Sequence, residues 1–309
     1  NKTYADSSLK AFATHMRKLN NNKTPETLDF LDDKTNIMEQ LNQMKLNTRK
    51  TYLISISTVL KAIGGKVALL KKYDEELNKD NKKYNTEKST HFLTETEEKN
   101  WTTLDTLKKT VLNKYRLKLI LKGIIGKSEE PKNILLNTDL YLLQKYLIAA
   151  LYLLQPSVRA DYIMKIIYNE DQNDNKQNYL LIDKKQYYFI FNDFKTVKSV
   201  GKQKTEVPKE IKKILKIWIK FNKERLKHDN SLLINSDMNP LNNNGLVKLI
   251  PIVFKNSEKH ITISLLRKIW ISETIDGKNG EKNCVLAKAM HHSTNTQYNT
   301  YFKVVKSPK

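Results

Sequence analysis

The stretch AKAMHHSTNTQYNTY spans Ala287–Tyr301 and is the most informative part of the sequence. Its first residues complete a helical pattern that we expect to run over Asn283–Met290. Two adjacent histidines follow this predicted helix, and Tyr298 and Tyr301 stand a short distance beyond them. Histidine side chains move protons, and a tyrosine hydroxyl attacks an electrophile once its own proton is removed. We therefore look for chemistry here first.

Three stretches of the chain share the order of a known pattern. In the motif MHHS, residues 290–293, His292 precedes Tyr301 by nine residues. The motif ITISLLRK, residues 261–268, carries Arg267, and LLQPSVRADY, residues 153–162, carries Arg159 after a predicted buried helix. Together they resemble the closing motif, the second box and the first arginine of the tyrosine recombinase/integrase family, and the resemblance covers nearly the whole chain. The Lys- and Asn-rich composition is typical of an AT-rich genome, such as that of a phage-like mobile element or virus.

The resemblance implies a role for each of five residues. Tyr301 would be the nucleophile, Arg159 and Arg267 would hold the scissile phosphate, and His292 would accept the tyrosine proton or bind the phosphate. A hairpin lysine would protonate the leaving oxygen, and Lys195 is the best candidate because it leaves a predicted strand in the sequence FNDFKT. Rival lysines on the same hairpin are Lys198, Lys202 and Lys204.

Some positions depart from the family's pattern. His291 stands where the family has glycine, and Ser264 stands where it usually has histidine or lysine. Tyr162 occupies the place three residues after the first arginine that is often acidic, so Asp161 is a possible supporting residue one place early. Tyr298 is the alternative nucleophile.

These residue types suit phosphodiester chemistry. Attack by a tyrosine hydroxyl builds negative charge on the non-bridging oxygens, and two fork-shaped guanidiniums can hold those oxygens without a metal. The chain has no GxxxxGK[ST] or GxGxxG loop and no HExxH motif, so nucleotide hydrolysis and zinc chemistry are disfavoured. We expect no cofactor and no metal. Taken singly, Arg159 and Arg267 are explained as surface arginines, His292 as a helix-end cap and Tyr301 as a core aromatic; their common order favours the joint interpretation.

The composition indicates a folded protein that binds a polyanion. The chain has 55 Lys plus Arg against 33 Asp plus Glu, a formal charge of +22, and 39% hydrophobic residues, enough for a real core. A single cysteine, Cys284, permits no internal disulfide and fits a reducing, intracellular compartment. The most apolar window, Leu140–Leu154, is interrupted by Gln144 and Lys145, so we expect a buried helix there and no membrane span.

The first part of the chain shows helical apolar spacing over 7–19, 35–44, 47–63 and 66–77. The almost wholly polar run from Asn78 to Thr90 is typical of a linker. We therefore predict a helical core-binding domain with linker over 1–88 and a mixed α+β catalytic domain over 89–309, a mainly α fold with a small β-sheet.

Further helices are expected over 95–121, 138–154, 209–227, 244–254 and 264–274, with another beginning near Val158. Two β-prone runs, 179–182 and 187–191, predict a small sheet. From Lys195 to Lys227 there are twelve Lys or Arg against three Glu; such a run is either a solvated helix face or a phosphate-tracking surface. The residues we expect to contact DNA are Arg49, Lys50, Lys198, Lys202 and Lys204.

The expected partner is double-stranded DNA, bound by a homo-tetramer. Because only eight residues follow Tyr301, whereas many recombinases carry a longer tail that docks on a neighbour, the tail is either absent or not included. Three other interpretations stay open: a type IB topoisomerase-like enzyme, a catalytically silent recombinase-derived DNA-binding protein, and a single-stranded nucleic-acid binder.

Overall fold

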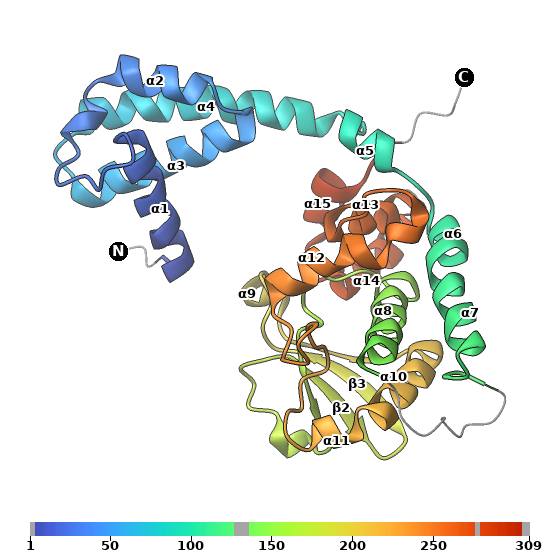
Figure 1. Cartoon of the computed structure of the whole chain (residues 1–309). Helices are drawn as coiled ribbons and strands as arrows, with labels where there is room; N and C mark the ends of the chain where they lie inside the picture. Colours follow the sequence, from blue (N-terminus) through green and yellow to red (C-terminus); the bar gives the residue numbers. More distant parts are fainter. Residues whose placement is uncertain (1–3, 127–135, 276–278, 305–309) are drawn as a thin grey trace. The chain divides into compact units, whose positions relative to one another are not determined.

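The computed structural model describes residues 4–126, 136–275 and 279–304. The chain divides into two compact units, Asn1–Thr90 and His91–Lys309. The fold is mainly helical with one small mixed sheet, which confirms the coarser part of the prediction, a mainly α fold with a small β-sheet (Figure 1).

Among its described residues, the first unit contains helices joined by turns and no strand. Helix α3 packs against α1, α2 and α4, because its apolar residues recur every three or four positions and form a continuous stripe. Leu53 and Ile56 of α3 are fully buried, and the Tyr73 hydroxyl of α4 donates to the Leu31 carbonyl at 2.9 Å. The helices are α1 (Asp6–Leu19), α2 (Lys34–Asn42), α3 (Leu46–Ile63) and α4 (Val67–Ser89), with a 3-10 turn at Asp29–Leu31.

The predicted linker is part of a helix. Residues 78–89 continue α4 in place of the irregular segment that their polarity indicated. They contain no Gly or Pro to end a helix, and Arg49 of α3 forms an ion pair with Asp80 at 3.2 Å. The Lys50 ammonium also lies 3.7 Å from the centre of the Tyr84 ring. Contacts of charged side chains with α3 thus support this helix, and polarity alone does not reveal them.

The second unit begins with short helices and a long buried one. The helix predicted over 95–121 is broken at Trp101–Thr103, because the Thr103 hydroxyl caps a new helix by accepting from Thr106 N and Glu273 accepts from Leu104 N at 3.0 Å. After the break, the helical run passes through a π-helical turn. The elements are α5 (Glu95–Asn100), α6 (Leu104–Leu107), the π-turn Lys108–Leu112, α7 (Asn113–Leu121) and α8 (Asn137–Leu153).

A four-stranded sheet follows, in the order β1-β2-β3-β4. β1 is parallel to β2, and the other pairs are antiparallel. Alternate residues separate the two faces: Leu180 and Phe189 join the main core with α8 and α10, whereas Leu181 and Ile190 form a smaller cluster. The strands are β1 (Lys165–Ile167), β2 (Tyr179–Asp183), β3 (Gln186–Phe191) and β4 (Gln203–Glu206), and sequence analysis found only β2 and β3.

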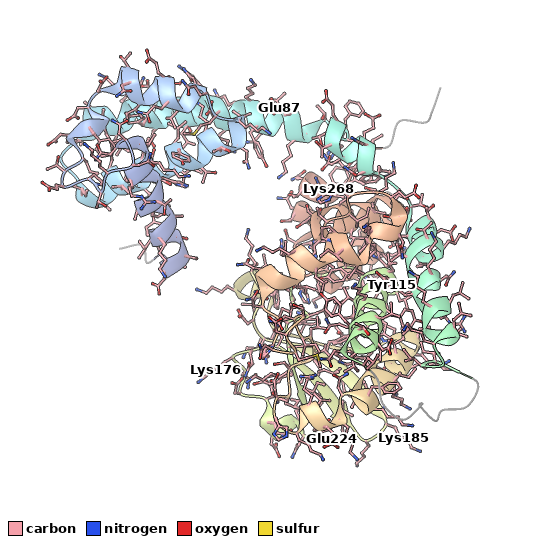
Figure 2. The ribbon with its side chains drawn as sticks, in the orientation of Figure 1. Glu87, Tyr115, Lys176, Lys185, Glu224 and Lys268 are labelled. Carbon is pink, nitrogen blue, oxygen red and sulfur yellow. The ribbon has the colours of Figure 1, made fainter. Side chains whose placement is uncertain are left out.

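The remaining helices complete the core around α8, which packs against α7, α10 and α12 (Figure 1). Figure 2 shows Tyr115, whose hydroxyl donates to the Val253 carbonyl at the end of α12 at 2.9 Å. The predicted helix over 209–227 is interrupted at Asn222. The elements are α9 (Val197–Val200), α10 (Lys209–Phe221), α11 (Lys223–Leu226), α12 (Asn243–Val253), α13 (Ile263–Thr274), α14 (Gly280–Ala289), α15 (Thr294–Thr296) and a π-turn, Gln297–Tyr301. Within the described residues, no helix has the length and apolar character needed to cross a membrane.

Candidate active site

Tyr301 lies buried at the end of the π-turn Gln297–Tyr301. Its hydroxyl is 3.2 Å from Nη2 of Arg159, which donates to it. The guanidinium carbon of Arg267 lies 4.7 Å from the centre of the Tyr301 ring. Two arginines separated by more than a hundred residues in sequence therefore meet on one phenol.

Arg159 is held in a loop and not in a helix. The prediction of a helix near Val158 is wrong, because α8 ends at Leu153 and residues 154–164 are irregular. The Tyr152 hydroxyl donates to the Arg159 carbonyl at 2.6 Å, and the Ser157 hydroxyl donates to the Tyr152 carbonyl at 3.0 Å. These bonds occupy backbone acceptors that a helix would use, and they fix the loop against the end of α8.

Arg267 is fully buried on α13, with its side chain 1% exposed. Its Nη1 donates to the Ser157 carbonyl at 2.6 Å and its Nη2 to the Met290 carbonyl at 2.8 Å. The guanidinium therefore ties the Arg159 loop to the end of α14. In the part of the chain that the structure describes, neither Arg267 nor Arg159 forms an ion pair with a carboxylate.

The end of α14 places His292. His292 N donates to the Ala287 carbonyl at 3.1 Å and His291 N to the Lys288 carbonyl at 3.0 Å, the two bonds of a Schellman motif. His291 takes the left-handed conformation of that motif, with φ 57°. Glycine is the usual residue at such a position, which gives a physical reason for the glycine of the recombinase pattern.

The surroundings of His292 favour its neutral form, and one of its ring nitrogens has no partner among the described residues. Burial, together with the charges of Arg267 and Arg159, lowers the pKa of His292 to about 3. Its Nδ1 lies 3.1 Å from the Ser293 carbonyl and must carry a hydrogen to bond it, which leaves Nε2 as an acceptor. Nε2 is buried and has no hydrogen-bond partner among the described residues. The His292 ring stacks on Tyr301 with centroids 5.2 Å apart.

The electrostatics of the cluster favour negative charge. Burial alone would raise the pKa of the Tyr301 phenol, but Arg267 and Arg159 outweigh it, so the pKa is lowered. A buried guanidinium that pairs with no carboxylate among the described residues, such as that of Arg267, is costly unless an anion binds it. The cluster of Arg159, Arg267, His292 and Tyr301 can therefore hold a phosphate group beside an activated phenol.

The lysines predicted near this cluster have different environments. Lys195 lies between β3 and α9 and is exposed, as is Lys198 of α9; neither has an ion pair or hydrogen bond within the described residues. Lys202 donates to the Asn175 carbonyl at 3.2 Å, and Lys204 of β4 forms an ion pair with Glu170 at 2.7 Å. Of the four, Lys195 and Lys198 keep unpaired ammonium groups.

The predicted supporting residues and the alternative nucleophile differ in their contacts. Asp161 accepts from His291 Nδ1 at 2.9 Å, so it contacts the motif, although not His292. Ser264 lies exposed in the first turn of α13, and the described residues give it no side-chain hydrogen bond. Tyr298 is half-exposed; its ring stacks on Phe302 and meets the His91 ring edge-on. No contact between Tyr298 and either arginine is found among the described residues.

The cations predicted to bind DNA in the first unit are internally engaged. Arg49 contacts Glu76 at 3.1 Å as well as Asp80, and its side chain is only 20% exposed. Burial lowers the pKa of Lys50, whose ammonium lies over Tyr84. Figure 2 labels two further lysines, Lys176 and Lys185, which lie on the loops next to β2 and β3.

Sequence reasoning gave no role to several residues around the cluster. Asn178 Nδ2 donates to the carbonyls of Asp161 at 3.0 Å and Asp193 at 2.9 Å, and Thr196 Oγ1 donates to the His291 carbonyl at 2.5 Å. In the sequence, the one feature that marks Asn178 is its position as a polar residue directly before a β-prone run. Nothing in the sequence pairs Thr196 with a residue ninety-five positions away.

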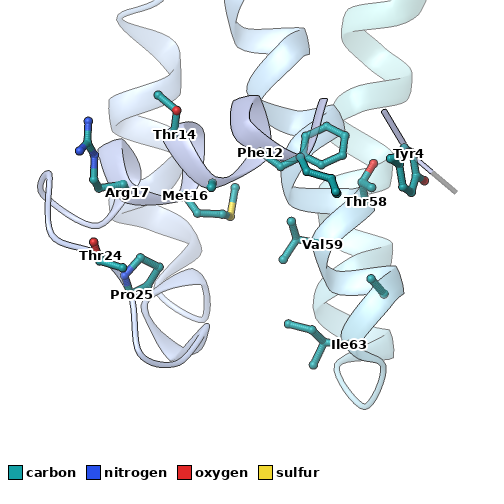
Figure 3. A pocket seen from close by; sticks show the side chains of 13 residues that line it. Tyr4, Phe12, Thr14, Met16, Arg17, Thr24, Pro25, Thr58, Val59 and Ile63 are labelled. Carbon is teal, nitrogen blue, oxygen red and sulfur yellow. The ribbon is translucent and has the colours of Figure 1, made fainter. Parts of the chain in front are cut away.

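A cavity of about 570 Å³ lies in the first unit (Figure 3). Apolar side chains from α1 and α3 line it, including Phe12, Met16 and Val59, with Arg17 at its edge. It contains none of the residues of the Tyr301 cluster. Over the described residues, no group of three or more His, Cys, Asp or Glu side chains is placed to hold a metal ion.

No protein-family model matches the sequence, and no curated protein matches it. Among solved structures, the chain is similar to that of XerA recombinase, with a TM-score of 0.38 and 12% identity, over 98% of this chain and 88% of that chain. No residue of this chain takes a role from that likeness.

Proposed function

We propose that this protein is a site-specific DNA recombinase or integrase that cleaves and rejoins DNA strands through a 3′-phosphotyrosine at Tyr301. The observation that carries the proposal is the contact of one buried phenol with Arg159 and Arg267, two guanidiniums that pair with no carboxylate among the described residues. A phenol beside two such cations is suited to attack a phosphodiester, because the cations stabilise both the phenolate and the charged phosphate.

The proposed first step is a transesterification. The Tyr301 oxygen forms a bond to phosphorus, and the bond from phosphorus to the 5′ oxygen breaks. His292 Nε2, a neutral acceptor, takes the phenol proton directly or through water. Attack by a different 5′-hydroxyl reverses the step and joins new strands, so the bond energy is kept and no ATP is needed.

The leaving oxygen needs a proton of its own. Lys195 is the proposed general acid, because it follows the first arginine in the order of the recombinase pattern and its ammonium has no ion pair among the described residues. Lys198 is the first alternative, because Lys202 is bonded to Asn175 and Lys204 is paired with Glu170.

The proposed substrate is double-stranded DNA, held by the helical first unit as core-binding domain and the second unit as catalytic domain, in a homo-tetramer. The formal charge of +22 supports binding dominated by backbone phosphates. Such binding weakens steeply with salt.

The proposal is tested by trapping protein on nicked suicide DNA, in which the strand end diffuses away after cleavage. Genomic or element-end fragments are first screened for salt-resistant binding. Parent, Tyr301→Phe and Tyr298→Phe are then compared on denaturing gels with a chelator present. An adduct that only Tyr301→Phe abolishes is the expected result. Tight binding without an adduct from any fragment would instead support a silent DNA-binding protein.

A second assay separates strand exchange from supercoil relaxation. The parent is incubated with two intact duplexes of different length that carry the bound sequence, and separately with supercoiled plasmid. Products that join strands of both duplexes support a recombinase, whereas relaxation without such products supports the topoisomerase-like alternative.

A further inference from the structure

His291 is buried against the segment that carries Lys195. Its side chain is 1% exposed, and its ring stacks on Phe194 with centroids 4.3 Å apart and planes 27° apart. The Phe191 ring meets it edge-on at 4.4 Å. Residues 192–196, here called the Lys195 loop, thus pack directly on the residue before His292.

The polar atoms of His291 form hydrogen bonds with the Lys195 loop and with the Arg159 loop. Nδ1 bonds Oδ2 of Asp161 at 2.9 Å, and an ionised carboxylate accepts only, so Nδ1 is the donor. The His291 carbonyl accepts from Thr196 Oγ1 at 2.5 Å and from Arg159 Nη1 at 3.4 Å. Both sequence neighbours of Lys195 therefore contact His291, which also contacts the Arg159 loop.

The backbone of His291 indicates that these side-chain contacts matter. Its φ of 57° lies in the left-handed region, which costs a histidine energy that a glycine would avoid. The ring stacking and the bond to Asp161 are what histidine adds at this position. Asn178, which bonds the carbonyls of Asp161 and Asp193, ties the same two loops together a second time.

We infer that His291 is a positioning residue that fixes the Lys195 loop against the cluster of Arg159, Arg267, His292 and Tyr301. The inference rests on the proposed function. In it, the His291 ring holds Phe194 and the His291 carbonyl holds Thr196, so that the Lys195 ammonium reaches the leaving 5′ oxygen. His291 itself touches no reacting atom.

The test compares two leaving groups. A 5′ oxygen leaves with a proton, but a sulfur in the same bridging position leaves as a thiolate and needs none, since thiols are far stronger acids than alcohols. The variant is His291→Gly, which suits the left-handed backbone and keeps the carbonyl that Arg159 and Thr196 use. Rates of adduct formation are measured on matched suicide DNAs with bridging oxygen or sulfur.

The expected result is selective. On the oxygen substrate, His291→Gly forms the adduct about tenfold more slowly than the parent, which is a part of the roughly 10²–10⁴-fold acceleration that a general acid contributes. On the sulfur substrate, its rate stays within about twofold of the parental rate. Lys195→Ala shows the same selectivity with a larger loss. His260→Ala, a substitution of an exposed histidine, matches the parent on both DNAs.

Phe194→Leu provides a second variant in case His291→Gly does not fold, and melting temperatures identify a folding defect. It removes the stacking from the loop side, and we expect the same preference for sulfur. Equal losses on both substrates, or no loss on oxygen, would overturn the inference while the proposed function stands. No adduct from the parent on either substrate would overturn the proposed function, and this inference with it.

Discussion

Replacing Arg267 by methionine separates the anion-binding role of this side chain from its structural one. Methionine is unbranched and fills most of the buried site, but it removes the charge and both hydrogen bonds. Ser157 and Met290 then each lose the donor to a buried carbonyl. We expect a moderate loss of stability and a large loss of activity.

The magnitudes follow from these contacts. A buried carbonyl without a donor costs about 1–3 kcal/mol, so two cost about 2–6 kcal/mol. Removing a desolvated, unpaired cation offsets part of this, so we expect the free energy of unfolding to fall by about 1–3 kcal/mol. Loss of one preorganised group facing the transition-state charge typically slows a reaction by about 10²–10³.

Arg225 offers a matched control. It also donates to backbone carbonyls, those of Asp229 and Ser231, but it has a carboxylate partner in Asp229 and lies outside the cluster. Arg225→Met should lower stability by a similar amount and leave the rate of adduct formation unchanged.

The assays are urea unfolding, with and without sulfate, and adduct formation on suicide DNA. Sulfate at 100 times its dissociation constant should stabilise the parent and Arg225→Met by about 2.7 kcal/mol, but not Arg267→Met. If Arg267→Met keeps both the sulfate response and the parental rate, the assignment of Arg267 as a phosphate ligand is wrong.

Three further predictions concern charge. The pKa of His292 is about 3 in the folded state and 6.5 in the unfolded state, so the unfolded state binds more protons between these pH values and the free energy of unfolding falls as pH falls. At pH 5 this loss is about 2 kcal/mol. In urea titrations, His292→Gln should lack this loss. Arg159→Met should raise the pKa of Tyr301, seen by NMR of ring-labelled tyrosine; an unchanged or lower value would contradict the contact. Arg49→Ala should destabilise the first unit by about 3 kcal/mol, since it leaves buried Asp80 unpaired; an unchanged melting temperature would argue against this.

Periodicity predicted most helices within a few residues, because apolar spacing reflects the face that each helix buries. The exceptions have local causes. Residues 78–89 are polar and yet helical, since the Arg49–Asp80 ion pair and the contact of Lys50 with the Tyr84 ring join them to α3. Strands β1 and β4 are short, and β4 is wholly polar in sequence, so neither shows an alternating apolar pattern.

Some residues of the candidate site could be predicted from the sequence, and others could not. The order of the motifs was enough to name Arg159, Arg267, His292 and Tyr301, which the fold brings into one cluster. The pairing of His291 with Asp161 could not be predicted, because contacts between residues 130 positions apart leave no mark in one sequence. The roles of these residues stay predictions.

The most direct test of the central claim is to identify the residue that becomes attached to DNA. Parent protein trapped on nicked DNA is digested with protease and nuclease, and the nucleotide-bearing peptide is sequenced by mass spectrometry. The account predicts a nucleotide 3′-phosphate on the Tyr301 oxygen. Attachment at Tyr298 or at any other residue would contradict it.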